Sequence, residues 1–140
     1  MKMDYNIEVI RGWPYDGSLD RNEPIKSGVT LLNGDWVEKQ TDGTVAKVSA
    51  TPTAAAGVVI QGNGDSASAV NSKKAVVLWG NFLAKVSNFD TTATYVPGSK
   101  LTAKSGKLSL AIGTDPVIGY VLDVVTAGAD QTAHLVVKVA

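Results

Sequence analysis

Short runs in which apolar and polar residues alternate follow one another along most of this chain. In Lys107–Ile112, the apolar side chains of Leu108, Leu110 and Ile112 alternate with Lys107, Ser109 and Ala111, which is the period of a half-buried strand. Comparable runs recur after short polar intervals. They predict about eight strands, at residues 35–39, 44–48, 57–60, 74–87, 100–104, 107–112, 117–126 and 133–139.

Turn residues separate these runs. Asp42-Gly43 lies between two alternating segments, and an Asp-Gly pair in that position is a strong hairpin signal because the turn needs a positive φ. The longest run, Lys74–Ser87, has apolar residues on both faces, so we expect both faces to be at least partly covered. Gly80, near its middle, indicates a bend or a bulge.

A weak internal echo links the two halves of the chain. Gly43 and Gly106 are 63 residues apart, Gly57 and Gly119 are 62 apart, and each pair begins a similar apolar segment. One interpretation is a pseudo-symmetric barrel in which each half contributes a hairpin and a further strand. The alternative is chance, since Gly and Val are frequent in this sequence.

Composition supports the same fold class. Val, Ile and Thr make up 37 of the 140 residues, and such β-branched side chains fit a pleated sheet. The alanine run Ala54–Ala56 is followed by Gly57 and is long enough for one helical turn at most. We therefore predict an all-β protein, a small β-barrel or sandwich of about eight strands.

Residues 1–27 differ from the body that we expect at residues 28–140. They contain Trp13-Pro14, Asp16-Gly17 and Glu23-Pro24 and show no sustained period, which predicts an extended N-terminal arm. The arm has too many apolar residues for a solvated tail. It either packs on its own domain or docks on a neighbouring subunit.

Charge and residue usage exclude several classes of protein. With 13 basic and 13 acidic side chains, nothing favours a nucleic-acid partner. Without cysteine there is no disulfide or thiolate site. The longest uncharged run, Val48–Gly64, is too polar to span a membrane, and the N-terminus lacks the apolar core of a signal peptide. We expect a protein that stays in a cytoplasm or in something assembled there.

Candidate chemistry is scarce. The single imidazole, His134, lies within a predicted strand and has no evident nucleophile to serve. The pairs Asp16/Asp20 and Asp115/Asp123 are the carboxylates that a glycosidase hypothesis would use, although turns explain Asp115 equally well. No phosphate loop or calcium loop is present. We predict no catalytic residue, no metal and no cofactor, and therefore no enzyme.

The arm and several body segments together resemble one family. These are the Pro- and Trp-containing arm ending near Ile25, and the segments Leu32–Val37, Asp42–Val45, Gly57–Val59 and Val117–Val121. The chain resembles the small capsid decoration proteins of tailed bacteriophages, also called cement or head-stabilising proteins. The resemblance implies an all-β protein, often a homotrimer, that binds the outer capsid surface and locks neighbouring capsomers against internal DNA pressure.

The resemblance also implies partners and contact residues. The partner would be the major capsid protein, and the location the capsid exterior of a virion assembled in the host cytoplasm. Burial and strand addition would let the arm contact capsid subunits, through Ile7, Val9, Ile10, Trp13 and Tyr15. Trp79 and Leu83 would be candidates for a subunit interface, because aromatic anchors are favoured there, although a core position is the alternative for any Trp.

Two other hypotheses compete with a decoration protein. A carbohydrate- or receptor-binding β module of a phage fibre would stack exposed aromatic rings, such as Trp36 and Tyr95, on sugar. A small hydrolase would need turnover that depends on Asp115 or Asp123. The missing constellation of base and nucleophile makes the hydrolase the weakest of the three.

Overall fold

The computed structural model describes residues 6–11, 19–65 and 73–139, and these residues form eleven strands and no helix. The prediction of an all-β protein is confirmed. The strands are β1 (Ile7–Arg11), β2 (Leu19–Pro24), β3 (Trp36–Lys39), β4 (Val45–Lys47), β5 (Ala56–Gln61), β6 (Lys74–Trp79), β7 (Phe82–Val86), β8 (Lys100–Lys104), β9 (Lys107–Leu110), β10 (Gly119–Val125) and β11 (His134–Val139).

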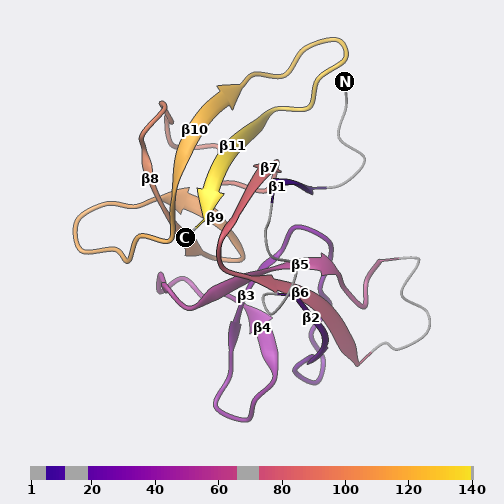
Figure 1. Ribbon diagram of the computed structural model, residues 1–140. Helices are drawn as coiled ribbons and strands as arrows, with labels where there is room; N and C mark the ends of the chain where they lie inside the picture. The colour runs from indigo at the N-terminus through magenta and orange to yellow at the C-terminus, as the bar shows by residue number, and fades with distance from the viewer. Residues whose placement is uncertain (1–5, 12–18, 66–72, 140) are drawn as a thin grey trace.

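The strands form two antiparallel sheets. A six-stranded sheet has the order β1-β7-β11-β10-β8-β9 and occupies the upper half of Figure 1, and a five-stranded sheet has the order β2-β6-β5-β3-β4 and occupies the lower half. Neither sheet closes into a barrel, and the arrangement is that of a sandwich. A shared apolar core lies between the two halves.

The predicted strand count was too low for two reasons. The run 74–87 is two strands, because Gly80 adopts a φ of +70° and sends the chain from the five-stranded sheet into the six-stranded one. Residues 1–27 contribute two further strands. The other predicted strands are present, and the strand at 100–104 has the predicted bounds.

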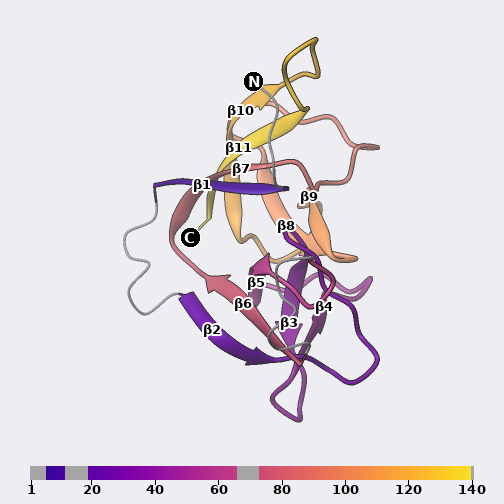
Figure 2. The same ribbon diagram turned by 90° about the vertical axis from the view of Figure 1, so that its right-hand side faces the viewer.

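The described part of the predicted arm pairs with the chain's own sheets. β1 runs antiparallel to β7 and β2 antiparallel to β6, so both form sheet edges, as Figure 2 shows. Ile25, close to the predicted boundary at residue 27, belongs to a buried core cluster. Nothing in these contacts separates residues 1–27 from the body at 28–140.

The fold contains an internal repeat. The N-terminal unit, β2–β6, has the strand order 4-3-5-6-2, and the C-terminal unit, β7–β11, has the order 9-8-10-11-7. The second order is the first with five added to every strand number. Gly57 of β5 pairs with Val37 and Trp79, while Gly119 of β10 pairs with Leu101 and Val139. The weak sequence echo at an offset of 62–63 residues therefore corresponds to a structural repeat.

Local details of the repeat agree as closely as its topology. A bulge interrupts the register of β5 with β6 after Val59 and the register of β10 with β11 after Val121. An isolated parallel bridge ties Ile25 to Val45 in one unit and Phe89 to Leu108 in the other. Each bridge links the two edges of its unit at one point, so both units curl around an interior.

The turn that precedes β3 in the N-terminal unit has a counterpart before β8 in the C-terminal unit. Gly34 N–H donates to the Val59 carbonyl over 2.8 Å, and Gly98 N–H donates to the Val121 carbonyl over 2.7 Å. Both glycines have a φ near +90°, a conformation that favours glycine. The side chains of Asp35 and Ser99 then accept a bond from the backbone three residues earlier, at 2.8 and 3.0 Å.

Each unit encloses apolar side chains, but the two cores differ in extent. The N-terminal unit has a private core that includes Leu31, Val37, Val45, Val59 and Val77. The larger cluster fills the C-terminal unit and continues into the opposite face of the N-terminal unit. This continuous core makes the two units one domain.

Candidate functional site

The described residues contain no cluster of His, Cys, Asp or Glu that could hold a metal ion. His134 is buried, and its Nδ1 lies 2.7 Å from the Thr132 carbonyl oxygen. Asp115 accepts a bond from Ile112 N–H, and Asp123 accepts one from Val124 N–H. Asp115 therefore serves its own turn, Asp123 bonds the backbone of its own strand β10 (Gly119–Val125), and Asp16 lies outside the described residues.

The densest polar network ties loops together. Asn33 accepts bonds from Asn6 N–H and Ile7 N–H and donates to the Ile60 carbonyl, and Asp65 accepts from Asn33 N–H and Gly62 N–H. Burial is the main cause that raises the pKa of the nearby Asp35 carboxyl, and the negative Asp65 adds to it. The hydrogen bonds of Asn33 and Asp65 tie their two loops to each other and to strands β1 and β5, which is a structural task.

A second polar group closes one end of the N-terminal unit. Glu23 is 3% exposed, forms an ion pair with Lys39 and accepts a 2.8 Å bond from Trp79 Nε1. Trp79, expected as a subunit-interface residue, is half-buried and packs against the private core of the unit. Its polar edge is thus already bonded within the chain.

The predicted contact residues of the arm differ in accessibility. Ile7 is 4% exposed and belongs to the shared core, Val9 is half-buried, and Ile10 is 50% exposed. The β1–β7 register shifts between Val9 and Arg11, so Ile10 occupies a bulge. Trp13 and Tyr15 lie outside the described residues. Ile7 stabilises the fold, and Ile10 is the described arm residue that presents a large apolar surface.

The aromatic residues expected to bind sugar are not on the surface. Trp36 is fully buried and stacks on Phe82 with ring centroids 6.4 Å apart. Tyr95 is 8% exposed and donates a 2.7 Å bond to the Asp90 carbonyl, and its burial raises the pKa of its hydroxyl to about 12. The prediction that these rings are exposed stacking surfaces was wrong, because both fill the shared core.

The largest group of exposed apolar residues lies on the C-terminal unit. We call it the β10 patch, and its members are Val96, Ile112, Val117, Tyr120 and Leu122, all between 41% and 67% exposed. Backbone bonds hold its parts together, since Gly98 N–H donates to the Val121 carbonyl and Ala111 N–H to the Lys100 carbonyl. Lys100 pairs with Tyr120 across the sheet, and Leu83, the other predicted interface residue, is half-buried on β7.

Sequence reasoning did not identify the β10 patch. Tyr120 and Leu122 alternate with Val121, so the strand is apolar on both faces. That pattern predicts that both faces are covered, and the structure covers one. An apolar strand face that stays exposed is typical of an interaction surface.

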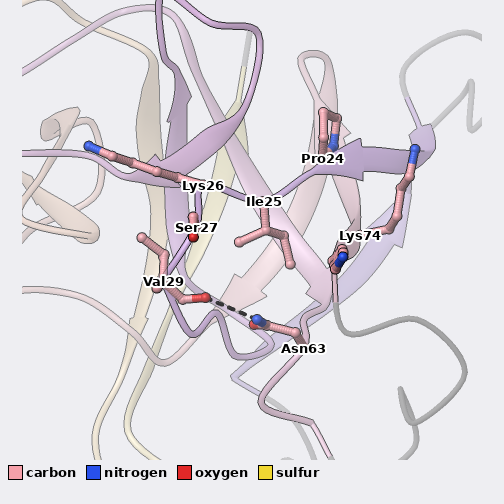
Figure 3. Close-up of a pocket in the computed structure, with 9 residues that line it drawn as sticks. Pro24, Ile25, Lys26, Ser27, Val29, Asn63 and Lys74 are labelled. Carbon is pink, nitrogen blue, oxygen red and sulfur yellow. Dashed lines mark hydrogen bonds between the residues drawn. The ribbon is translucent and has the colours of Figure 1, made fainter.

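The described residues also line an open depression of about 560 Å³ beside the end of β2. Figure 3 shows Asn63 directed at the Val29 carbonyl, to which its amide donates over 2.9 Å. Its side-chain oxygen accepts from Leu31 N–H. The exposed Lys26 and Lys74 lie at the rim. The Asn63 side chain therefore serves to hold the loop around Val29 and Leu31.

No protein-family model, curated protein or solved structure matches this chain. In the part of the chain that the structure describes, no helix is long and apolar enough to cross a membrane.

Proposed function

We propose that this protein is a structural virion protein that binds the outer surface of a bacteriophage capsid and stabilises the head lattice. Its partner is the major capsid protein, and it acts as a homo-oligomer, with a trimer as the expected state. Three features support the proposal: the resemblance in sequence pattern to decoration proteins, described polar groups engaged in loop and turn structure, and large apolar side chains left at the surface.

The observation that carries the proposal is the open edge of β1. Among the described strands, the edges of the N-terminal unit are linked by the Ile25–Val45 bridge, and β9 is linked to Phe89. β1 pairs with β7 on one side and lies outside the internal repeat. No described strand pairs with its other side. Ile7 N–H is bonded to Asn33 Oδ1, so the edge beyond Ile7 is where a strand could be added.

Ile10 adds an apolar contact at this edge. Half of its surface is exposed, so its burial against a capsid subunit contributes about 1 kcal/mol. Such a contact is weak by itself. Repetition over many copies on a lattice, with each oligomer engaging several sites at once, raises the overall affinity by avidity.

The first experiment counts copies of the chain in purified particles from its source by quantitative mass spectrometry. We expect near-parity with the major capsid subunit. Absence from particles, or only a handful of copies per particle, would overturn the proposal, and the second result would favour a fibre component.

A second experiment tests the β1 edge. Ile10→Glu places a charge where an apolar contact is proposed, and Leu32→Glu is the matched control because Leu32 is also exposed, at 45%, but on the N-terminal unit. In co-sedimentation with undecorated capsids, we expect Ile10→Glu to weaken binding about tenfold or more. Equal binding by Ile10→Glu and the unmodified chain would show that β1 does not dock on the capsid.

A further inference from the structure

Because the fold contains an internal repeat, an interface formed within the chain can be compared with the equivalent surface of the other unit. Within the chain, one face of the N-terminal unit packs against an end of the C-terminal unit. The face is formed by Trp36, Val48, Val58 and Leu78, all at most 2% exposed. These side chains belong to the shared core, so we call them the packed face.

The surface that the packed face meets is the tip of the β8–β9 hairpin and the start of β7. Trp36 N–H donates to the Gly106 carbonyl over 3.0 Å, and Ser105 N–H donates to the Ser49 carbonyl over 2.8 Å. Phe82 stacks on Trp36. The intramolecular interface is therefore of the heterologous kind, in which a face of one unit meets a hairpin tip of the other.

The repeat places the β10 patch where the packed face lies in the other unit. By strand register, Tyr120 and Leu122 of β10 correspond to Val58 and Ile60 of β5. Val58 is fully buried, whereas Tyr120 is 44% exposed. The positions of Trp36, Val58 and Leu78 are taken by Lys100, Tyr120 and Lys138 in the C-terminal unit. The equivalent face is therefore partly apolar and partly basic, and the described chain leaves Tyr120 exposed on it.

The complementary surface is also exposed at the other end of the molecule. Gly43, at the tip of the β3–β4 hairpin, corresponds to Gly106, and both have a positive φ. Gly106 is buried under the packed face, while Gly43 is exposed. Figure 1 shows the β3–β4 tip at the bottom of the molecule, far from β10.

One complementary pair of charges stands at the two exposed surfaces, and the tip also carries Lys39, whose Nζ donates to the Gly43 carbonyl. Lys100 stands at the position of Trp36, next to Tyr120, and is exposed. Asp42 stands at the position of Ser105, beside Gly43, and is exposed as well. In the intramolecular interface the two corresponding positions are close to each other, since Trp36 bonds to Gly106. A contact between copies would bring Asp42 and Lys100 together in the same way.

From these correspondences we infer that the β10 patch binds the β3–β4 hairpin tip of a second copy of this chain. The contact repeats between molecules the packing that joins the two units within one molecule. Because each copy carries one patch and one tip, the association is head to tail and produces a closed ring or an open chain. The inference names the surfaces of the proposed self-association and does not depend on capsid binding.

The test uses the full chain in solution, without capsids, so its failure is separate from a failure of the capsid proposal. The patch variant is Leu122→Glu, which adds a charge that repels Asp42. The tip variant is Thr41→Lys with Asp42→Asn, which keeps the side-chain oxygen that accepts bonds from Thr44. Leu32→Glu is again the control. All substitutions are at exposed positions, and circular dichroism verifies that each variant is folded.

Sedimentation velocity over a range of concentrations measures the outcome. We expect the unmodified chain and Leu32→Glu to associate beyond the 14.6 kDa monomer, and each test variant to weaken association about tenfold or more. A mixture of the two test variants retains one intact patch and one intact tip, so it forms pairs of one copy each and grows no further.

Three results would overturn the inference. The unmodified chain could remain a monomer up to its solubility limit. It could associate equally well in both test variants, which would place the contact elsewhere. The mixture could stay monomeric while both test variants are folded, which would exclude head-to-tail pairing of the patch and the tip.

Discussion

The N-terminal and C-terminal units share one backbone plan and use it differently. In the first unit, Trp36 of β3 and Val58 of β5 belong to the shared core, and Glu23 of β2 is bonded to Lys39 and Trp79. In the second unit, the equivalents of that face are exposed, and the hairpin end is buried under the first unit. Equivalent strands therefore carry different side chains because they face different neighbours.

This difference shows how a repeat becomes a single domain. Two independent curls of five strands would each need a polar outer surface. Here one face of the N-terminal unit is apolar and packs against the interior of the C-terminal unit. The shared core buries more apolar area than either unit could alone. The buried Glu23 is bonded to Lys39 and Trp79 within the N-terminal unit, since a buried carboxylate needs partners.

The most severe test of the comparison removes a ring from the packed face. Trp36→Ala deletes a fully buried side chain that stacks on Phe82, so we expect a loss of about 3–5 kcal/mol in the free energy of unfolding. Lys100→Ala, at the equivalent position of the other unit, should change it by no more than about 0.5 kcal/mol. Denaturant titration measures both free energies of unfolding. Similar losses would contradict the finding that one position is buried and the equivalent position is exposed.

A smaller effect is expected at the paired glycines. An added Cβ at Gly119 would overlap the Lys138 backbone carbonyl, whereas one at Gly57 would lie 2.7 Å from side-chain carbons of Trp79 and Val77. Overpacking costs about 1–3 kcal/mol. Because side chains yield more readily than backbone, Gly119→Ala should be more destabilising than Gly57→Ala in thermal or chemical unfolding. The reverse order would show that the two sites are not packed as described.

The smallest effect concerns the repeated turn before β3 and β8. Asp35 and Ser99 accept the same backbone bond, but only Asp35 ionises, and burial raises its pKa above 3.8. The folded state then holds this proton more tightly than the unfolded state. The contribution of Asp35 to stability therefore falls as the pH rises from below 3.8 through the raised pKa.

Asp35→Asn keeps an acceptor oxygen and removes this titration. Relative to the unmodified chain, the variant should gain stability as the pH rises from below 3.8 through the raised pKa of Asp35. Asp42 and Asp90, whose pKa values are lowered by bonds from Thr44 and Thr92, are present in both proteins, so their effects cancel in the comparison. A stability difference that is constant over this pH range would show that Asp35 does not titrate as described.

The strands were predictable because their signals are local. The period of two in 107–112 and the glycines at Gly43 and Gly106 depend on neighbouring residues alone. The crossing between sheets at Gly80 was visible as a bend, but its destination was not, because pairing partners are far away in sequence. For the same reason β1 and β2 were missed, since their order comes from pairing with β7 and β6.

The candidate interaction surfaces show the same limit, because their exposure depends on segments that are distant in sequence. The sequence left two environments open for Trp36, a core position and, in the fibre hypothesis, a sugar-binding surface. Tyr120 lay within the predicted strand 117–126, whose pattern could not tell whether its face would be covered. In the structure Trp36 lies in the core, whereas Tyr120 lies on the surface. Alternation shows that a side chain faces one side of a sheet, and it carries no information about what lies on that side.

By itself, the sequence determined the all-β class, most strand positions, the hairpin turns and the scarcity of catalytic chemistry. These follow from residue type and short-range sterics. The tertiary structure decided that the chain forms two repeated units, that the outer face of one is core and that of the other is surface, and that β1 lies at the end of its sheet with no described strand beyond it. Those outcomes depend on which distant segments pack together, because burial is a property of the neighbours that a side chain finds when the chain folds.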